Sequence, residues 1–214
     1  MTDSLKSGAQ FLLRPTSGVP LSLQQIEEHS RKIDDGRFAI EYRITSHEYR
    51  DSAGRLRQES ETRDQAGHLV ASAVAITDPV AGAQTILLDA EKVAYRLKVK
   101  LSPDPRLFLT DAADGQDSPH KWKVIHTEIE DRKIEGYVFK GTRIETSAED
   151  VAGLTTTIDR WYSDQLKLFG AIDRKGPFQA YTIRIQQLQF REPDHALFEI
   201  PVDYQVVDVE MPQP

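Results

Sequence analysis

The sequence predicts an all-β protein built on a single, strongly curved antiparallel sheet, and three observations support this fold class. First, short segments alternate apolar and polar residues, as strands with one buried face do. Second, clusters of Gly, Pro, Asp and Ser separate these segments at the close spacing of hairpin turns. Third, in residues 76–96 the turn Asp78–Gly82 joins two such alternating segments. This pattern favours a half-barrel or a two-layer sandwich.

Length and composition favour one folded domain. The chain has 214 residues, of which 39% are hydrophobic, so it can bury a substantial core. Residues 1–20 mix Gly and Pro with small polar residues, and we expect a flexible lead-in there. The curved β domain is expected to occupy residues 21–214.

Charge and residue usage exclude several classes of function. The formal net charge of −7 argues against a nucleic-acid binder, because phosphate recognition requires clustered Lys and Arg. Because the chain contains no cysteine, it has no disulfide and no thiolate nucleophile. No run of about 18 apolar residues is present, so we expect no membrane span.

Predicted strands fill the first half of the chain. Residues 22–32 have a helix-like composition, but the hairpin signal Asp34–Gly36 and a clear strand follow, so extended structure is favoured. In that following strand the apolar residues are expected on one face, and they are Phe38, Ile40, Tyr42 and Ile44. The remaining predicted strands are 56–63, 69–77, 84–89 and 92–100.

The second half begins with the longest predicted loop. Residues 102–120 contain three prolines, and they form either a functional cover or a flexible insertion. In the last long strand the apolar positions change phase, which predicts a bulge near Gln186–Gln187. A helical turn is expected at His195–Phe198. The predicted strands of this half are 122–130, 137–146, 154–163, 166–173 and 179–190.

Several ordered segments resemble an uncharacterised family of acidobacterial envelope proteins. The segments are Tyr49–Arg57, Asp78–Gly82, Trp161–Ser163, Arg191–Phe198 and Pro201–Tyr204. The resemblance implies a fold similar to the half-barrel of the periplasmic lipoprotein carriers, the LolA-like fold. It also implies a periplasmic or other extracytoplasmic location, with the secretion signal removed from this chain. The family has no established catalytic residues, so the resemblance assigns none.

No segment contains a complete catalytic, metal or cofactor site. His126 and Glu128 are the best pair, because alternation puts both on one strand face, yet a solvated face explains them as well. Ser163 lacks the flanking glycines of a nucleophile elbow. We therefore expect a protein that is not an enzyme and that has no metal site and no cofactor.

A row of positive charge follows one strand of this acidic protein. It consists of Lys92, Arg96, Lys98 and Lys100. Such a row could attract anionic lipid headgroups or an acidic partner. Lysines on an outer strand face also protect a sheet edge from pairing, and this simpler interpretation stays open.

Apolar residues of three predicted strands form the candidate ligand-binding face. They are expected to line the concave side of the sheet, and they are Phe38, Ile40, Tyr42, Ile44, Val93, Tyr95, Leu97, Tyr181 and Ile183. A curved sheet with few helices leaves either a ligand cavity or a partner groove on this side. Alternatively, the loop 102–120 and the N-terminal segment fill it as ordinary core.

The sequence therefore favours a non-catalytic envelope protein that binds a hydrophobic ligand, a lipid or a lipoprotein acyl chain, on its concave face. The alternative is an interaction or sensor module that contacts an envelope protein through strand edges or the loop 102–120 and has no small-molecule ligand.

Overall fold

The structure is a computed structural model that describes residue 13 and residues 15–99 and 120–209. Its only helical element among these residues is the short 3-10 helix η3 (His195–Phe198), and no described helix is long and apolar enough to cross a membrane. The prediction of an all-β protein is therefore confirmed. The strands are β1 (Leu21–Lys32), β2 (Phe38–Arg50), β3 (Leu56–Asp64), β4 (Leu69–Asp78), β5 (Ala83–Leu88), β6 (Val93–Lys98), β7 (Trp122–Ile134), β8 (Tyr137–Ala148), β9 (Thr155–Ser163), β10 (Leu168–Lys175), β11 (Gln179–Gln189) and β12 (Gln205–Val209).

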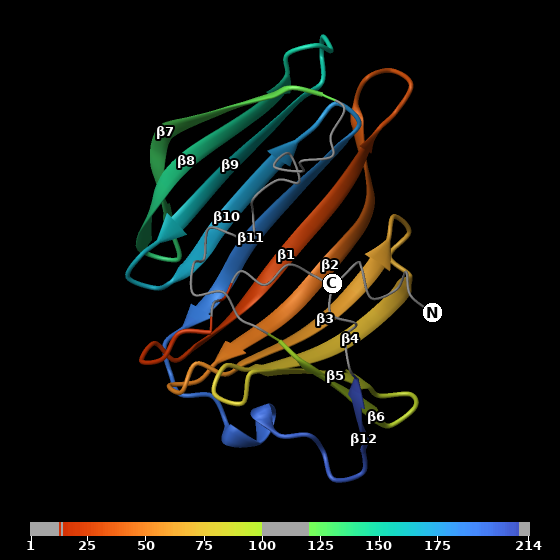
Figure 1. The fold of residues 1–214 in the computed structure, drawn as a ribbon, viewed down its shortest axis with the longest axis vertical. Helices are drawn as coiled ribbons and strands as arrows, with labels where there is room; N and C mark the ends of the chain where they lie inside the picture. The colour runs from red at the N-terminus through yellow and green to blue at the C-terminus, as the bar shows by residue number, and fades with distance from the viewer. Residues whose placement is uncertain (1–12, 14, 100–119, 210–214) are drawn as a thin grey trace.

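All twelve strands belong to one curved sheet, in the order β12-β6-β5-β4-β3-β2-β1-β11-β10-β9-β8-β7 (Figure 1). Strand β1 pairs with β2 on one side and with β11 on the other, and a meander extends outward from each of these neighbours. Every pairing is antiparallel except the one between β12 and β6. The single curved antiparallel sheet is thus confirmed, with two more strands than the ten or so that the sequence indicated.

Strand β1 is extended despite its helix-like composition. Both of its edges are hydrogen-bonded, and burial alternates along its first half. Leu21, Leu23, Gln25 and Glu27 are buried, whereas the residues between them are half-exposed. Pairing with two neighbours outweighs the weak helix propensity of these residues, so the predicted extended structure is confirmed.

The bulge predicted in the last long strand is present in β11. Gln187 has a φ of 57°, and the register between β1 and β11 shifts between Ser22 and Gln24. The extra residue reverses the facing of the side chains beyond it.

We call the two sides of the sheet the leucine face and the tryptophan face. The leucine face bears Leu21 and Leu23 of β1, and the tryptophan face bears Trp161 of β9. The buried apolar core extends over both faces, mainly in the half of the sheet from β1 to β8. Its main members on the leucine face are Leu21, Leu23, Leu56, Ile144, Ile158, Phe169, Ile172, Ile183 and Ile185.

The tryptophan face packs closely around the ring of Trp161. The indole Nε1 donates a hydrogen bond to the carbonyl of Glu130 at 2.9 Å, and the guanidinium of Arg132 lies 3.5 Å from the ring centroid. Nearby, a Cβ on Gly170 would lie 2.7 Å from the ring of Phe139. This distance is too short for any side chain, so glycine is required at this position.

Arg50, the last residue of β2, is fully buried and connects three segments of the chain. Its Nε donates to the carbonyl of Val19 at 2.8 Å. Its Nη1 and Nη2 donate to the carbonyls of Lys167 at 3.3 Å and Leu166 at 2.7 Å, in the turn between β9 and β10. One guanidinium therefore holds the N-terminal segment and the β9–β10 turn against β2.

Burial lowers the pKa of Arg50 to about 10, and the neighbouring Tyr162 and Glu48 partly oppose this decrease. At pH 7 the guanidinium is still charged. A buried charge must be hydrogen-bonded to be tolerated, and the three carbonyls meet this requirement.

The turn after Arg50 is built around the buried carboxylate of Asp51. This carboxylate accepts hydrogen bonds from the backbone N–H of Arg55 at 2.8 Å and from its Nε at 2.6 Å. Gly54 has a φ of 88°, and the backbone of Thr16 lies 3.0 Å from the position of a Cβ. The N-terminal segment thus crosses the turn at a residue that must be glycine.

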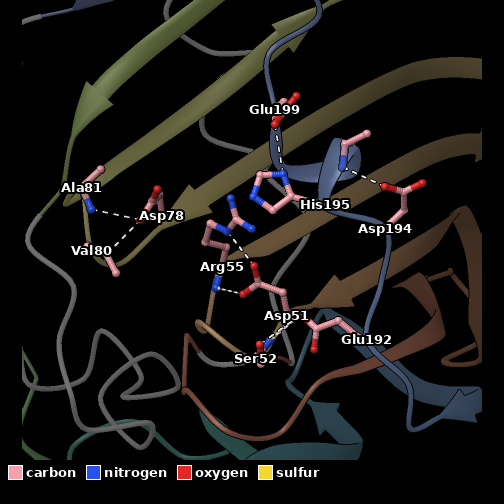
Figure 2. A network of polar contacts seen from close by, with 11 residues as sticks. Asp51, Ser52, Arg55, Asp78, Val80, Ala81, Glu192, Asp194, His195 and Glu199 are labelled. Atoms are coloured by element: carbon pink, nitrogen blue, oxygen red, sulfur yellow. Dashed lines mark hydrogen bonds and ion pairs between the residues drawn. The ribbon is translucent and has the colours of Figure 1, made fainter.

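The C-terminal segment docks against the same turn (Figure 2). Glu192 accepts hydrogen bonds from the backbone N–H and the hydroxyl of Ser52, both at 3.1 Å. Asp194 caps η3 by accepting a hydrogen bond from the N–H of Ala196 at 3.0 Å. The predicted helical turn is therefore confirmed.

The structure describes little of the predicted loop 102–120 but part of the predicted lead-in 1–20. Residues 100–119 lie outside the described residues, so the predicted loop is not described beyond its last residue. Within the expected lead-in, Leu13 is buried and forms a β-bridge with Leu168.

We expect Arg50→Met to lower the free energy of unfolding by about 3–5 kcal/mol, because it leaves three carbonyls without their charged donor. Urea denaturation measures this change. Arg43→Met, which removes an exposed arginine of β2 that pairs with Glu28 of β1, should have a much smaller effect. Equal losses in the two variants would contradict the role given to Arg50.

We expect Gly170→Ala to destabilise the protein by about 1–3 kcal/mol, because the added methyl group overlaps the ring of Phe139. Thermal unfolding measures the loss. Adding Phe139→Leu should recover part of it by making room. If the loss of stability in the double variant exceeds the sum of the losses in the two single variants, the clash is not the cause.

Candidate functional site

Seven of the nine predicted ligand-binding residues share the leucine face. Cross-strand pairs establish this, because Glu27 of β1 lies opposite both Ile44 and Ile183, and His29 lies opposite both Tyr42 and Tyr181. The seven residues are Tyr42, Ile44, Val93, Tyr95, Leu97, Tyr181 and Ile183.

The other two residues, Phe38 and Ile40, lie on the tryptophan face. His29 pairs with Tyr42, but the next residue of β1, Ser30, pairs with Ile40. Glu41 is therefore an extra residue in β2, and the side chains that precede it in the strand point to the opposite face from the one that continued alternation would give. The expectation that all four apolar residues of β2 share one face is wrong for these two.

The seven residues form two groups rather than one patch. Four of them surround β1 at the middle of the sheet, whereas Val93, Tyr95 and Leu97 are on β6. Four strand spacings separate β2 from β6, which is roughly 19 Å along a flat sheet. Ile44 and Ile183 are buried, and the other five residues are half-exposed, so apolar surface remains accessible at both groups.

A buried polar row crosses the leucine face between the apolar residues, and the sequence analysis did not identify it. Glu27 is 2% exposed and contacts the Nε2 of His29, and its second oxygen accepts a hydrogen bond from Gln25 at 3.4 Å. The His29 ring stacks on Tyr42 with centroids 4.4 Å apart and lies 5.4 Å from Tyr181. In a strand, every second residue after Leu21 and Leu23 lies on the same face. This rule places Gln25, Glu27 and His29 on the leucine face, so the sequence contained the signal for the row.

The surroundings of Tyr42 favour its neutral form. Burial raises the pKa of the Tyr42 phenol, and the charges of Glu27 and Glu41 raise it further. A neutral phenol can donate a hydrogen bond, so Tyr42 offers both an apolar ring and a donor at the edge of the polar row.

The polar row continues on β2 and β3. Glu48 is 1% exposed and accepts hydrogen bonds from Gln58 Nε2 at 3.1 Å and from the backbone N–H of Leu13 at 3.4 Å. Between Glu48 and Ile44 lies Ser46, which is fully buried. Its hydroxyl has no hydrogen-bond partner among the described residues. Because Ser46 is inaccessible to solvent, this hydroxyl is not available to a ligand on the face.

A separate hollow of about 460 Å³ lies on the tryptophan face over β2–β5. It is largely polar, and exposed His47 lies opposite Glu59, whose carboxylate is paired with Arg57 at 2.7 Å. Its lining residues are Thr45, His47, Glu59, Ser60, Glu61, Ser72, Ala73, Val74, Leu87 and Asp89. None of the nine predicted ligand-binding residues lines it.

Acidic partners compensate much of the positive row. Lys92 contacts Asp89 at 2.6 Å, and Arg96 contacts Asp208 of β12 at 2.7 Å. The hydrogen bond from Lys92 lowers the pKa of Asp89, and the hydrogen bond from Arg96 lowers that of Asp208. Lys98 is exposed, and Lys100 lies outside the described residues. The binding of an anionic partner to this row stays a prediction.

His126 and Glu128 lie on one face of β7, as alternation predicted, and both are exposed. Within the described parts of the chain, no group of three His, Asp or Glu side chains is arranged to hold a metal ion.

Comparison with known proteins gives similar solved structures but no sequence family. No family model and no curated protein matches the chain. It is similar to a chain of the MucA/MucB complex of Pseudomonas aeruginosa, with 16% identity and a TM-score of 0.44. This match covers 88% of the present chain and 59% of the other, so the chain spans less than two thirds of that protein.

Two further similar structures match over most of their own length. One is a β-barrel-like protein of domain of unknown function DUF1849 from Brucella abortus, with 9% identity, coverage of 82% and 99%, and a TM-score of 0.39. The other is a LolA superfamily protein from Nitrosomonas europaea, with 9% identity, coverage of 88% and 92%, and a TM-score of 0.33. A LolA superfamily protein is thus among the similar structures, and these similarities concern the fold alone.

Proposed function

We propose that this chain is a non-catalytic envelope protein that binds a hydrophobic ligand, a lipid or the acyl chain of a lipoprotein, on its leucine face. The observation that carries the proposal is the half-exposed apolar surface of that face. Tyr42 and Tyr181 present it beside β1, and Tyr95 presents it on β6. The extracytoplasmic location implied by the sequence resemblance belongs to the same proposal.

Burial of an acyl chain supplies the binding energy. Each methylene group removed from water contributes about 0.8 kcal/mol, so a short enclosed chain reaches micromolar affinity before ordering costs are subtracted. The polar row gives the ligand a preferred orientation. The half-exposed Tyr42 can donate a hydrogen bond from its phenol to the polar end of a ligand while the ligand's chain covers the apolar residues.

Native mass spectrometry of protein purified from a Gram-negative host should detect a stoichiometric lipid adduct. The adduct should disappear on denaturation, because its binding is non-covalent, and lipid extraction then identifies it. A bare protein mass, with no lipid in the extract, would contradict the proposal and favour the interaction module.

Tyr95→Asp should reduce lipid retention at least about tenfold, because a carboxylate on the apolar face must be desolvated when the acyl chain binds. Lipid per protein after purification is the measurement. Ile40→Asp is the matched control, since it introduces the same charge in the predicted apolar set but on the tryptophan face. Equal retention by the Tyr95 variant and the control would place the ligand elsewhere.

A further inference from the structure

Strand β7 ends the sheet with a long outer edge. The strand has 13 residues, and no other described strand pairs with that edge. The opposite edge differs, because β12 has only five residues. A long unpaired edge presents a row of backbone N–H and C=O groups that can accept an added strand.

The first part of β7 is uncovered on both faces. Residues 123–128 are all exposed, including the apolar side chains of Val124 at 43% and Ile125 at 39%. Val124 and Ile125 point to opposite faces because they are neighbours in a strand. A partner strand would therefore gain apolar contacts on both sides of the sheet.

The hydrogen-bonding register identifies which backbone groups point outward. The carbonyl of Lys121 accepts a hydrogen bond from the N–H of Glu149 at 2.8 Å, so Lys121 faces β8. Facing alternates along an antiparallel strand. The N–H and C=O groups of Trp122, Val124, His126 and Glu128 consequently point away from β8.

The sequence of this edge is complementary to itself. In an antiparallel pair of two β7 strands centred on Thr127, His126 of each copy lies opposite Glu128 of the other. Ile125 lies opposite Ile129 in the same register. Both His126 and Glu128 present outward backbone groups, so they can exchange the two hydrogen bonds of an antiparallel pair.

We propose that a second copy of this chain pairs with β7 and forms a symmetric dimer with a sheet continuous across both copies. The same surface then serves both partners, as two-fold symmetry requires. Two His–Glu pairs and two Ile–Ile pairs follow from this register. The register shift of β7 between Ile129 and Arg132 ends the flat segment and limits the pairing to about seven residues.

Charge reversal tests the dimer and its register. Size-exclusion chromatography with light scattering should give the wild-type chain twice its mass of 24.2 kDa at micromolar concentration. His126→Glu should weaken dimerisation at least about tenfold, because it places two carboxylates opposite each other in both pairs, and Glu128→Lys should weaken it because it removes both carboxylates that His126 meets. Both residues are exposed, so the fold should be unaffected.

An equimolar mixture of the two variants should recover the dimer, since every acidic residue then faces a His or Lys. Glu91→Lys in the turn between β5 and β6 makes the same charge change away from β7 and should leave the dimer intact. A monomeric wild-type chain overturns the proposal, and so does a mixture that stays monomeric. Neither outcome bears on lipid retention, which is tested at Tyr95 of β6 in the other half of the sheet.

Discussion

The burial of one charged guanidinium is the constraint on which the arrangement of the sheet depends. Arg50 is charged at pH 7 and inaccessible to water, so its donors must all meet acceptors. The acceptors are carbonyls of Val19, Leu166 and Lys167, which are far apart in sequence. In this structure the burial of Arg50 is accompanied by the approach of these segments to the end of β2. The N-terminal segment and the two halves of the sheet are therefore held together at one point.

The segments that resemble the acidobacterial family have structural roles here. Arg50 and Asp51 belong to the first of them and organise the end of β2 and its turn. Trp161–Ser163 precedes the turn whose carbonyls Arg50 binds, and Arg191–Phe198 supplies the carboxylate that meets Ser52. Residues that fix a fold can be shared by proteins with different ligands.

Alternation in the sequence predicted the strands and most of their facing, because many of the strands have one face that is largely buried. The bulge in β11 was predictable, since apolar residues on both sides of Gln187 mark the change of phase. The bulge at Glu41 was not predictable, because apolar residues occupy every second position on both sides of Glu41 without a change of phase. The polar row was missed for a different reason. Glu27 and His29 are polar, and polar side chains of a strand are ordinarily assigned to its exposed face.

The polar row is the part of the leucine face that a simple core does not explain. Burying the carboxylates of Glu27 and Glu48 disfavours folding unless each is hydrogen-bonded, and both have partners. The hydroxyl of Ser46 has none among the described residues. Because Ser46 is also inaccessible to solvent, its hydroxyl is not a contact for a ligand bound on this face. The accessible polar contact beside this row is Tyr42, which is half-exposed and stacks on His29, so a lipid on the leucine face can accept a hydrogen bond from its phenol while its chain covers the neighbouring apolar side chains.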